Sequence, residues 1–190
     1  MNSVKTDNSH IEAKLALRRH FLNKYHAGKP ISVFDACQGG GAVWSLLRKE
    51  YKCRQYWGVD VKKKKGRLQI DSSRILAQPG WDFDVIDVDV YGMPWKHYFA
   101  LLPNLRGPAT VFLTVGLVRM SGGGMIGRAA ERRIGLSFKR RVPPSLVGAM
   151  AEFAANFCLA ACWNCGVKCT RAAEAETDGR ARYIGLRLEP

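Results

Sequence analysis

Five apolar segments rich in β-branched and aromatic residues alternate with helical segments, and this alternation limits the possible folds more than any other feature of the sequence. The strand-like segments comprise residues 31–37, 55–61, 68–71, 83–90 and 109–118. Apolar residues at helical spacing predict helices over residues 11–26, 41–51, 72–78 and 94–105. Such alternation is typical of an α/β protein whose mostly parallel sheet carries helices on both faces.

The last part of the chain has a different pattern, which adds an antiparallel hairpin. A long apolar helix is expected from residue 144 to about residue 165. Two strand-like segments follow, and the letters TDGR between them are typical of a hairpin turn. We therefore expect seven strands in one sheet.

The chain has 190 residues, 47% of them hydrophobic, which is enough for one domain with a substantial core. We expect residues 1–30 to form an N-terminal helical extension and residues 31–190 to form a single domain. Residues 119–143 are rich in glycine and in basic side chains and lack periodicity, so they predict a long basic loop.

The first strand ends in an acid that is followed by glycines, in the stretch VFDACQGGGAVW at residues 33–44. The dinucleotide fingerprint G-x-G-x-x-G fits from Gly39 but fails at its last position, where Trp44 stands. The phosphate-binding P-loop pattern fails as well. Asp35 would repel a pyrophosphate at the ligand-binding end of the strand and would attract a cation. This favours S-adenosylmethionine, a nucleoside that lacks phosphate and carries a positive sulfonium and a positive amino group.

The stretch DACQGGG resembles the first motif of class I S-adenosylmethionine-dependent methyltransferases. Two further acids end the next strand segments, Asp60 in WGVDVK and Asp71 in LQIDSS. The resemblance implies a Rossmann-like class I methyltransferase fold and a role for Asp60 in binding the ribose hydroxyls and for Asp71 near the adenine amino group. The cofactor-binding residues that it implies are Asp35, Ala36, Gly39, Gly41, Asp60 and Asp71.

The fourth strand segment, DVIDVDVYGMPW, carries Asp87 and Asp89 on one face, because side chains alternate along a strand. Buried carboxylates are costly unless they are paired, so a role is expected for them. The segment resembles the fourth motif of amino-group methyltransferases, and most closely that of the tRNA guanine-N2 dimethyltransferases. The positions that align are Asp87, Asp89, Tyr91, Gly92 and Pro94, whereas Val90 replaces a proline and Met93 a serine.

This resemblance implies two catalytic residues. Asp89 would accept a hydrogen bond from an exocyclic amine and orient its lone pair, and Tyr91 would offer a ring on which a base can stack. Because methyl transfer is an in-line displacement, holding the reacting atoms collinear supplies most of the catalysis.

The chain has 30 Lys and Arg against 16 Asp and Glu, a net charge of +14, which favours a polyanionic partner. We expect a nucleic acid, RNA rather than DNA. The run KKKK at residues 62–65 is typical of a solvated turn or of a contact with phosphates. The basic loop is the better candidate for substrate binding, through Arg128, Arg132, Arg133 and Arg140.

Two other functions stay open at this point. A methyltransferase-like fold without catalysis could bind nucleic acid or a partner subunit, and a methyltransferase could act on a small molecule or a protein.

Cys158, Cys162 and Cys165 have the C-x3-C-x2-C spacing of radical S-adenosylmethionine enzymes, but only 25 residues follow them. If residues 158–169 were all helical, Cys158 and Cys169 would lie ~16 Å apart, so the set could not bind one ion. We expect small buried thiols and no metal, although a zinc site that uses part of the set stays open. No apolar run reaches the ~18 residues of a membrane helix, and no secretion signal is recognisable, so we expect a cytoplasmic protein.

Overall fold

The computed structural model describes residues 10–63, 68–116, 147–175 and 181–190. The strands are β1 (Ile31–Asp35), β2 (Cys53–Asp60), β3 (Leu68–Gln69), β4 (Val85–Val88), β5 (Ala109–Gly116), β6 (Lys168–Ala175) and β7 (Ala181–Glu189). The helices are α1 (Ile11–His26), α2 (Ala42–Glu50), α3 (Ser72–Leu76), α4 (Trp95–Leu101), the 3₁₀ helix η1 (Leu102–Asn104) and α6 (Val147–Asn164).

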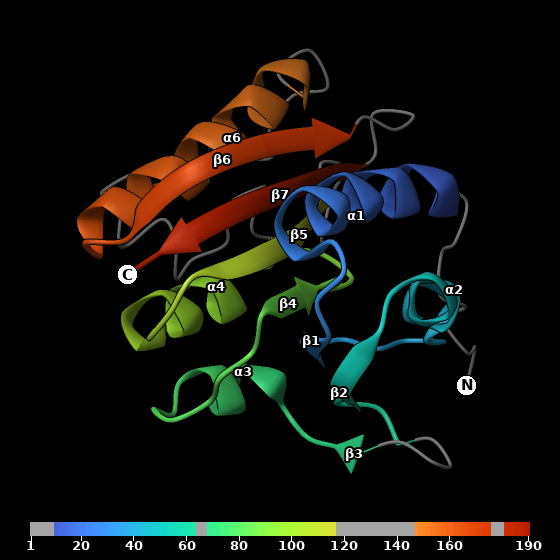
Figure 1. The fold of residues 1–190 in the computed structure, drawn as a ribbon. Coiled ribbons are helices and arrows are strands. Elements are labelled where there is room, and N and C mark those ends of the chain that lie inside the picture. The colour runs from blue at the N-terminus through green and yellow to red at the C-terminus, as the bar shows by residue number, and fades with distance from the viewer. Residues whose placement is uncertain (1–9, 64–67, 117–146, 176–180) are drawn as a thin grey trace.

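The described strands form one seven-stranded sheet in the order β3-β2-β1-β4-β5-β7-β6. The five strands from β3 to β5 pair in parallel, and β7 pairs antiparallel with β5 and with β6. The chain order reverses between β1 and β4, and in open α/β sheets ligands bind outside the carboxyl ends of the strands at such a point. The sheet, with its antiparallel pair, confirms the predicted topology (Figure 1).

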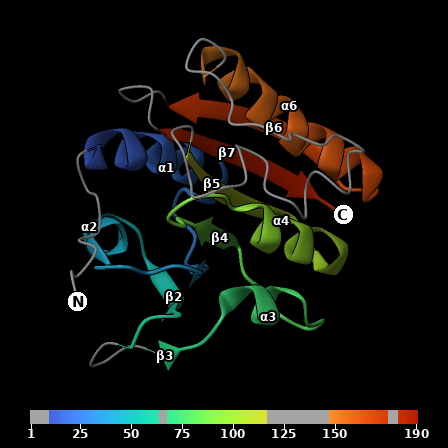
Figure 2. The same ribbon diagram turned by 180° about the vertical axis from the view of Figure 1, so that it is seen from behind.

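Helices cover both faces of the sheet, as predicted (Figures 1 and 2). On one face α1 and α2 bury a cluster that includes Leu22, Trp44 and Val33. On the other face α3, α4 and α6 bury a larger cluster that includes Phe34 and Ile86. Side chains of a strand point alternately to the two faces, so the central strands contribute apolar residues to both clusters.

Helix α1 packs against β7, β6 and α2. Its Phe21 is fully buried and meets the ring of Phe112 edge-on, with the ring centroids 5.7 Å apart. A Cβ atom at Gly185 would lie 2.5 Å from Cε2 of Phe21, so the absence of a side chain in β7 lets the helix approach the sheet. The predicted N-terminal helix is therefore part of the packed layer on this face.

The predicted basic loop at 119–143 lies outside the described residues. Across the residues that the structure describes, no helix combines the length and the apolarity that a membrane crossing demands.

Candidate active site

A tight turn joins β1 to α2 and forms the centre of the candidate site. The N–H of Ala36 donates to a carbonyl of β4 (2.8 Å) and the N–H of Gln38 to a carbonyl of β2 (2.9 Å), so the turn is tied to both neighbouring strands. Gly39 and Gly41 have positive φ angles of 52° and 72°, a region that side chains disfavour. The glycines that the sequence places here are therefore required by the backbone of the turn.

Asp60, the last residue of β2, is fixed beside this turn. Its carboxylate accepts hydrogen bonds from the N–H of Gly39 (3.0 Å) and from the N–H of Lys62 (2.9 Å). The side chain is half-buried. The structure thus brings together two of the predicted cofactor-binding residues, one from each of two adjacent strand ends.

Asp71 follows β3 and begins α3. It accepts hydrogen bonds from the N–H and the hydroxyl of Ser73 (3.0 and 2.7 Å) and forms an ion pair with Lys96 of α4 (2.6 Å). The hydrogen bond from Lys96 and those from Ser73 lower the pKa of Asp71 to about 2. The carboxylate therefore stays ionised at physiological pH and links α3 to the start of α4.

Asp35 ends β1 and its side chain is buried on the α1 and α2 side of the sheet. It accepts a hydrogen bond from the hydroxyl of Tyr56 (2.7 Å). Burial, reinforced by the nearby negative charge of Asp87, raises the pKa of Asp35 to about 8. The sequence argument treats Asp35 as an anion that attracts a cation, whereas this environment favours its protonated form at neutral pH. Its role in cofactor binding stays a prediction.

Asp87, near the end of β4, is held in a fully buried ion pair. The Nε and Nη2 atoms of Arg18 donate to its two oxygens at 2.7 and 2.6 Å, and Nε1 of Trp44 donates to Oδ2 at 2.7 Å. Arg18 and Asp87 each expose only 1% of their side chains. Trp44, which stands where the dinucleotide fingerprint has its last glycine, thus donates a hydrogen bond to a buried carboxylate.

Asp89, which immediately follows β4, lies on the same face of the sheet as Asp87, as predicted. Its Oδ2 accepts a hydrogen bond from Nζ of Lys14 and its Oδ1 one from Oγ1 of Thr114, both at 2.6 Å. Burial alone would raise the pKa of Asp89, but the positive charges of Lys14 and Arg18 outweigh it and hold the pKa below its usual range. Asp89 is therefore ionised and bonded at both oxygens.

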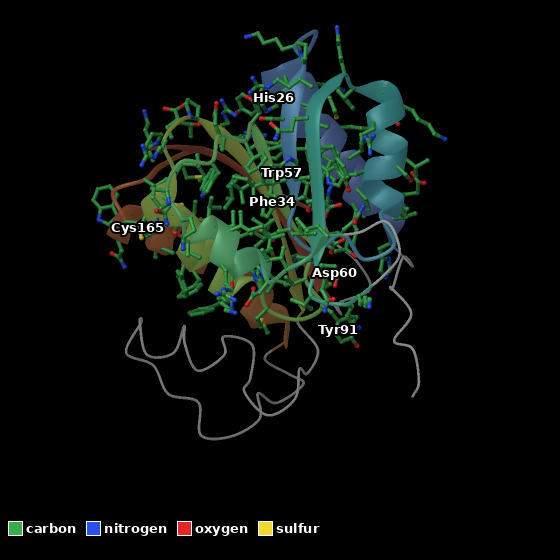
Figure 3. All side chains as sticks on the ribbon, turned by 90° about the horizontal axis from the view of Figure 1, so that it is seen from below. His26, Phe34, Trp57, Asp60, Tyr91 and Cys165 are labelled. Carbon is green, nitrogen blue, oxygen red and sulfur yellow. The ribbon has the colours of Figure 1, made fainter. Side chains whose placement is uncertain are left out.

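The turn after Asp89 presents Tyr91, whose side chain is 77% exposed. Gly92 adopts a φ of 120°, and its carbonyl accepts a hydrogen bond from the N–H of Gly116 at the end of β5 (2.8 Å). Pro94 then begins α4, as its position in the sequence predicts. Tyr91 and Asp60 lie at the same end of the molecule, opposite His26 (Figure 3).

The predicted acids thus lie in three places along one edge of the sheet. Gly39 and Asp60 are bonded to each other at the glycine turn, and Asp71 bridges α3 and α4. Asp35, Asp87 and Asp89 form an acidic group beneath α1, in which Arg18 pairs with Asp87 and Lys14 with Asp89. Asp35 and Asp87 are buried, and Asp89 is partly buried.

The side chains that donate hydrogen bonds to these three acids were not identified from the sequence. They are Lys14, Arg18, Trp44, Tyr56 and Thr114. One signal could have identified two of them: Lys14 and Arg18 are one helical turn apart and fall on the apolar stripe of α1, where a cation needs a buried partner.

The predicted substrate-binding residues Arg128, Arg132, Arg133 and Arg140 lie outside the described residues. Cys158 and Cys162 are buried in α6, and the hydroxyl of Tyr98 lies 2.8 Å from Sγ of Cys162. Within the described ranges, no three His, Cys, Asp or Glu side chains are arranged to hold a metal ion.

Comparisons of the structure with solved structures identify the fold. The complex of Trm1 from Pyrococcus horikoshii with S-adenosyl-L-methionine aligns with a TM-score of 0.63 at 16% identity, over 100% of this chain and 58% of that one. Magnesium protoporphyrin IX methyltransferase from Synechocystis, with bound S-adenosylhomocysteine, aligns with a TM-score of 0.56 at 14% identity, over 98% of this chain and 87% of that one. The 1,6-didemethyltoxoflavin-N1-methyltransferase from Burkholderia thailandensis aligns with a TM-score of 0.51 at 14% identity, over 96% and 82%.

The chain therefore has the fold of class I S-adenosylmethionine-dependent methyltransferases, which confirms the predicted fold class. It spans 58% of the length of the Trm1 structure. The sequence itself matches no protein-family model and no curated protein.

Proposed function

We propose that this protein is an S-adenosylmethionine-dependent methyltransferase that acts on an exocyclic amine of a nucleic-acid base. The observation that carries the proposal is the arrangement along the carboxyl edge of the sheet. There Asp60 is bonded to the glycine turn, and Asp89, which is held ionised, is followed two residues later by the exposed aromatic ring of Tyr91. The methyltransferase fold supports the same assignment.

The donor and acceptor set at the glycine turn fits this cofactor. Asp60 is an acceptor fixed by backbone N–H groups on both sides, which suits the two vicinal hydroxyls of a ribose. The turn at Gly39 and Gly41 brings backbone rather than side chains to the end of β1, next to Asp35 and Ala36. Asp71 offers an ionised acceptor after β3 for the adenine amino group. When bound, the cofactor supplies a methyl group on a positively charged sulfur.

Asp89 and Tyr91 would position the acceptor nucleotide. Because Asp89 stays ionised, it can accept a hydrogen bond from an amine and direct the nitrogen lone pair toward the end of β1. The exposed ring of Tyr91 offers a stacking surface of the kind that flipped or single-stranded bases use. Both residues would orient the acceptor amine, and the correct orientation of the reacting atoms supplies most of the rate of an in-line displacement.

The net charge of +14 supports a nucleic-acid substrate, and we propose RNA, with the arginines of the basic loop as phosphate contacts. The six cysteines are all free, which is compatible with a reducing compartment such as the cytoplasm.

A second candidate function, a non-catalytic methyltransferase-like binding module, is favoured by two observations. Lys14 forms an ion pair at 2.6 Å with the acid that would orient the amine, and Val90 stands where the resembling motif has proline. If Lys14 keeps Asp89 from accepting a hydrogen bond from a substrate amine, the chain could bind nucleic acid without modifying it.

Transfer of a labelled methyl group separates the two functions. Purified protein is incubated with labelled S-adenosylmethionine and with tRNA, rRNA or DNA that lacks modification. We expect label in RNA and at least roughly a hundredfold less with Asp89→Ala, since positioning errors at a reacting group commonly cost that much. Asp82→Ala is the matched control, because Asp82 is exposed and precedes β4 at its opposite end.

Equal transfer by Asp89→Ala and by the wild type would remove Asp89 from its role. Salt-dependent binding of RNA without any transfer would instead support the binding module.

A further inference from the structure

Helix α1 carries two cations into the core one turn apart, Lys14 and Arg18, which are 5% and 1% exposed. A buried cation is costly unless a negative group compensates it. Both side chains find that compensation at one place, the acids that end β4. The helix therefore contributes directly to the candidate active site.

Lys14 makes the contact closest to the proposed chemistry. Its ammonium lies 2.6 Å from Oδ2 of Asp89 and 5.2 Å from the centre of the Tyr183 ring on β7. Its backbone carbonyl accepts a hydrogen bond from Nη1 of Arg18 (3.0 Å). The ammonium thus lies between α1, β7 and the end of β4.

This contact fixes the orientation of the carboxylate as well as its charge. Lys14 holds one oxygen of Asp89 from α1, and Thr114 holds the other from β5 at 2.6 Å. Two donors on different elements determine the plane of the carboxylate, which one donor alone would leave free to rotate. A substrate amine that donates a hydrogen bond to one of the remaining lone pairs of the carboxylate is then held in a defined direction.

We infer that Lys14 is a positioning residue, which acts through Asp89 by holding that carboxylate in one orientation for the acceptor amine. The inference rests on the proposed function. It assigns to the N-terminal helix a part in the methyl-transfer step, because without Lys14 the acid at the end of β4 would lose one of its two donors and its principal counter-charge.

The pH dependence of Asp89 is set by groups from every element around it. These charged and titratable groups are Lys14 and Arg18 on α1, Asp35 on β1, Cys37 in the turn after β1, Asp87 on β4 and Tyr183 on β7. Of these, Lys14 has the largest favourable effect on the ionised form of Asp89. Replacing Lys14 by a neutral residue should therefore raise the pH at which Asp89 ionises.

A double-mutant cycle on kcat tests the inference. The variants are Lys14→Met, Asp89→Asn and the double variant. Arg19→Met is the control, because Arg19 lies on the same helix as Lys14 and forms an exposed ion pair with Glu50 of α2. We expect Lys14→Met to lower kcat roughly tenfold to a hundredfold, with the KM for S-adenosylmethionine changed less than about twofold. In the Asp89→Asn background the same change should have almost no effect, because the group through which Lys14 acts is already altered.

Two further variants guard against a folding defect. Lys14→Arg keeps the charge and should retain most of the activity, whereas Lys14→Gln keeps a donor without the charge and should shift the acid limb of the kcat profile to higher pH. An equal loss in both backgrounds of the cycle, or full activity in Lys14→Met, would overturn the inference.

If the wild type transfers no methyl group, the proposed function fails, and a separate measurement still tests Lys14. Carbon-13 NMR of the aspartate carboxyl groups follows the titration of Asp89 directly. A higher midpoint in Lys14→Gln than in the wild type supports control of Asp89 by Lys14, and identical midpoints contradict it.

Discussion

Replacing Arg18 by methionine should destabilise the protein more than any exposed charge substitution on α1. The guanidinium and the carboxylate of Asp87 are each 1% exposed and share two hydrogen bonds of 2.6 and 2.7 Å. Methionine fills much of the same volume but leaves a buried carboxylate without its cation. Removing one partner of such a pair costs about 3–5 kcal/mol.

This magnitude can be measured by thermal and urea unfolding. For a chain of this size about 1 kcal/mol lowers the Tm by about 2–4 °C, so a fall of about 6–20 °C is expected. The double variant Arg18→Met and Asp87→Asn should recover at least half of the loss, because the unpaired charge is gone. Arg19→Met, whose partner Glu50 is 38% exposed, is the control and should change the stability little.

The reasoning is refuted if Arg18→Met unfolds at the same temperature as Arg19→Met. It is also refuted if the double variant is as unstable as the single one, since the cost would then come from packing rather than from the unpaired carboxylate.

Three further changes test other parts of the structure. Gly185→Ala should lower the free energy of unfolding by about 1–3 kcal/mol, because its Cβ would lie 2.5 Å from the buried ring of Phe21. Gly107→Ala is the control and should be neutral, because a Cβ there would meet open space. Equal stabilities of the two variants in urea unfolding would contradict the close packing at Gly185. Asp35→Asn should gain stability relative to the wild type as the pH rises from ~4 to 8, by at most ~1.4 kcal/mol per pH unit. The reason is that the folded wild type retains a proton on Asp35 that the unfolded chain releases in this range. A difference in the free energy of unfolding between the two proteins that does not change with pH would contradict the pKa of about 8. Trp44→Phe should cost about 1.5–3 kcal/mol in the same assay by removing one hydrogen bond to a buried carboxylate, and a neutral result would mean that the indole N–H is dispensable.

The sequence predicts the fold well because its signals are local. A β-branched run that ends in an acid and glycines marks β1 and its turn, and the positive φ angles of Gly39 and Gly41 are what those glycines permit. Alternation along β4 likewise predicts that Asp87 and Asp89 share a face, and both contact α1.

The partners of these acids depend on contacts distant in the sequence, which periodicity does not specify. Lys14 and Asp89 are 75 residues apart, and Arg18 and Asp87 are 69 apart. The charge state of Asp35 was equally beyond local reasoning, because it follows from burial beside another acid. The position of an acid could be predicted from the pattern of its strand, but its pKa depends on neighbouring side chains that only the structure identifies.

Calorimetric titration of the protein with S-adenosylmethionine tests the central claim most directly, because it needs no knowledge of the substrate. The account predicts saturable binding by the wild type and by Asp82→Ala, and binding weakened about tenfold or more by Asp60→Ala, which loses charge-assisted hydrogen bonds. Absence of binding by the folded wild-type protein, or equal affinity of the wild type and Asp60→Ala, would contradict a cofactor site at the glycine turn.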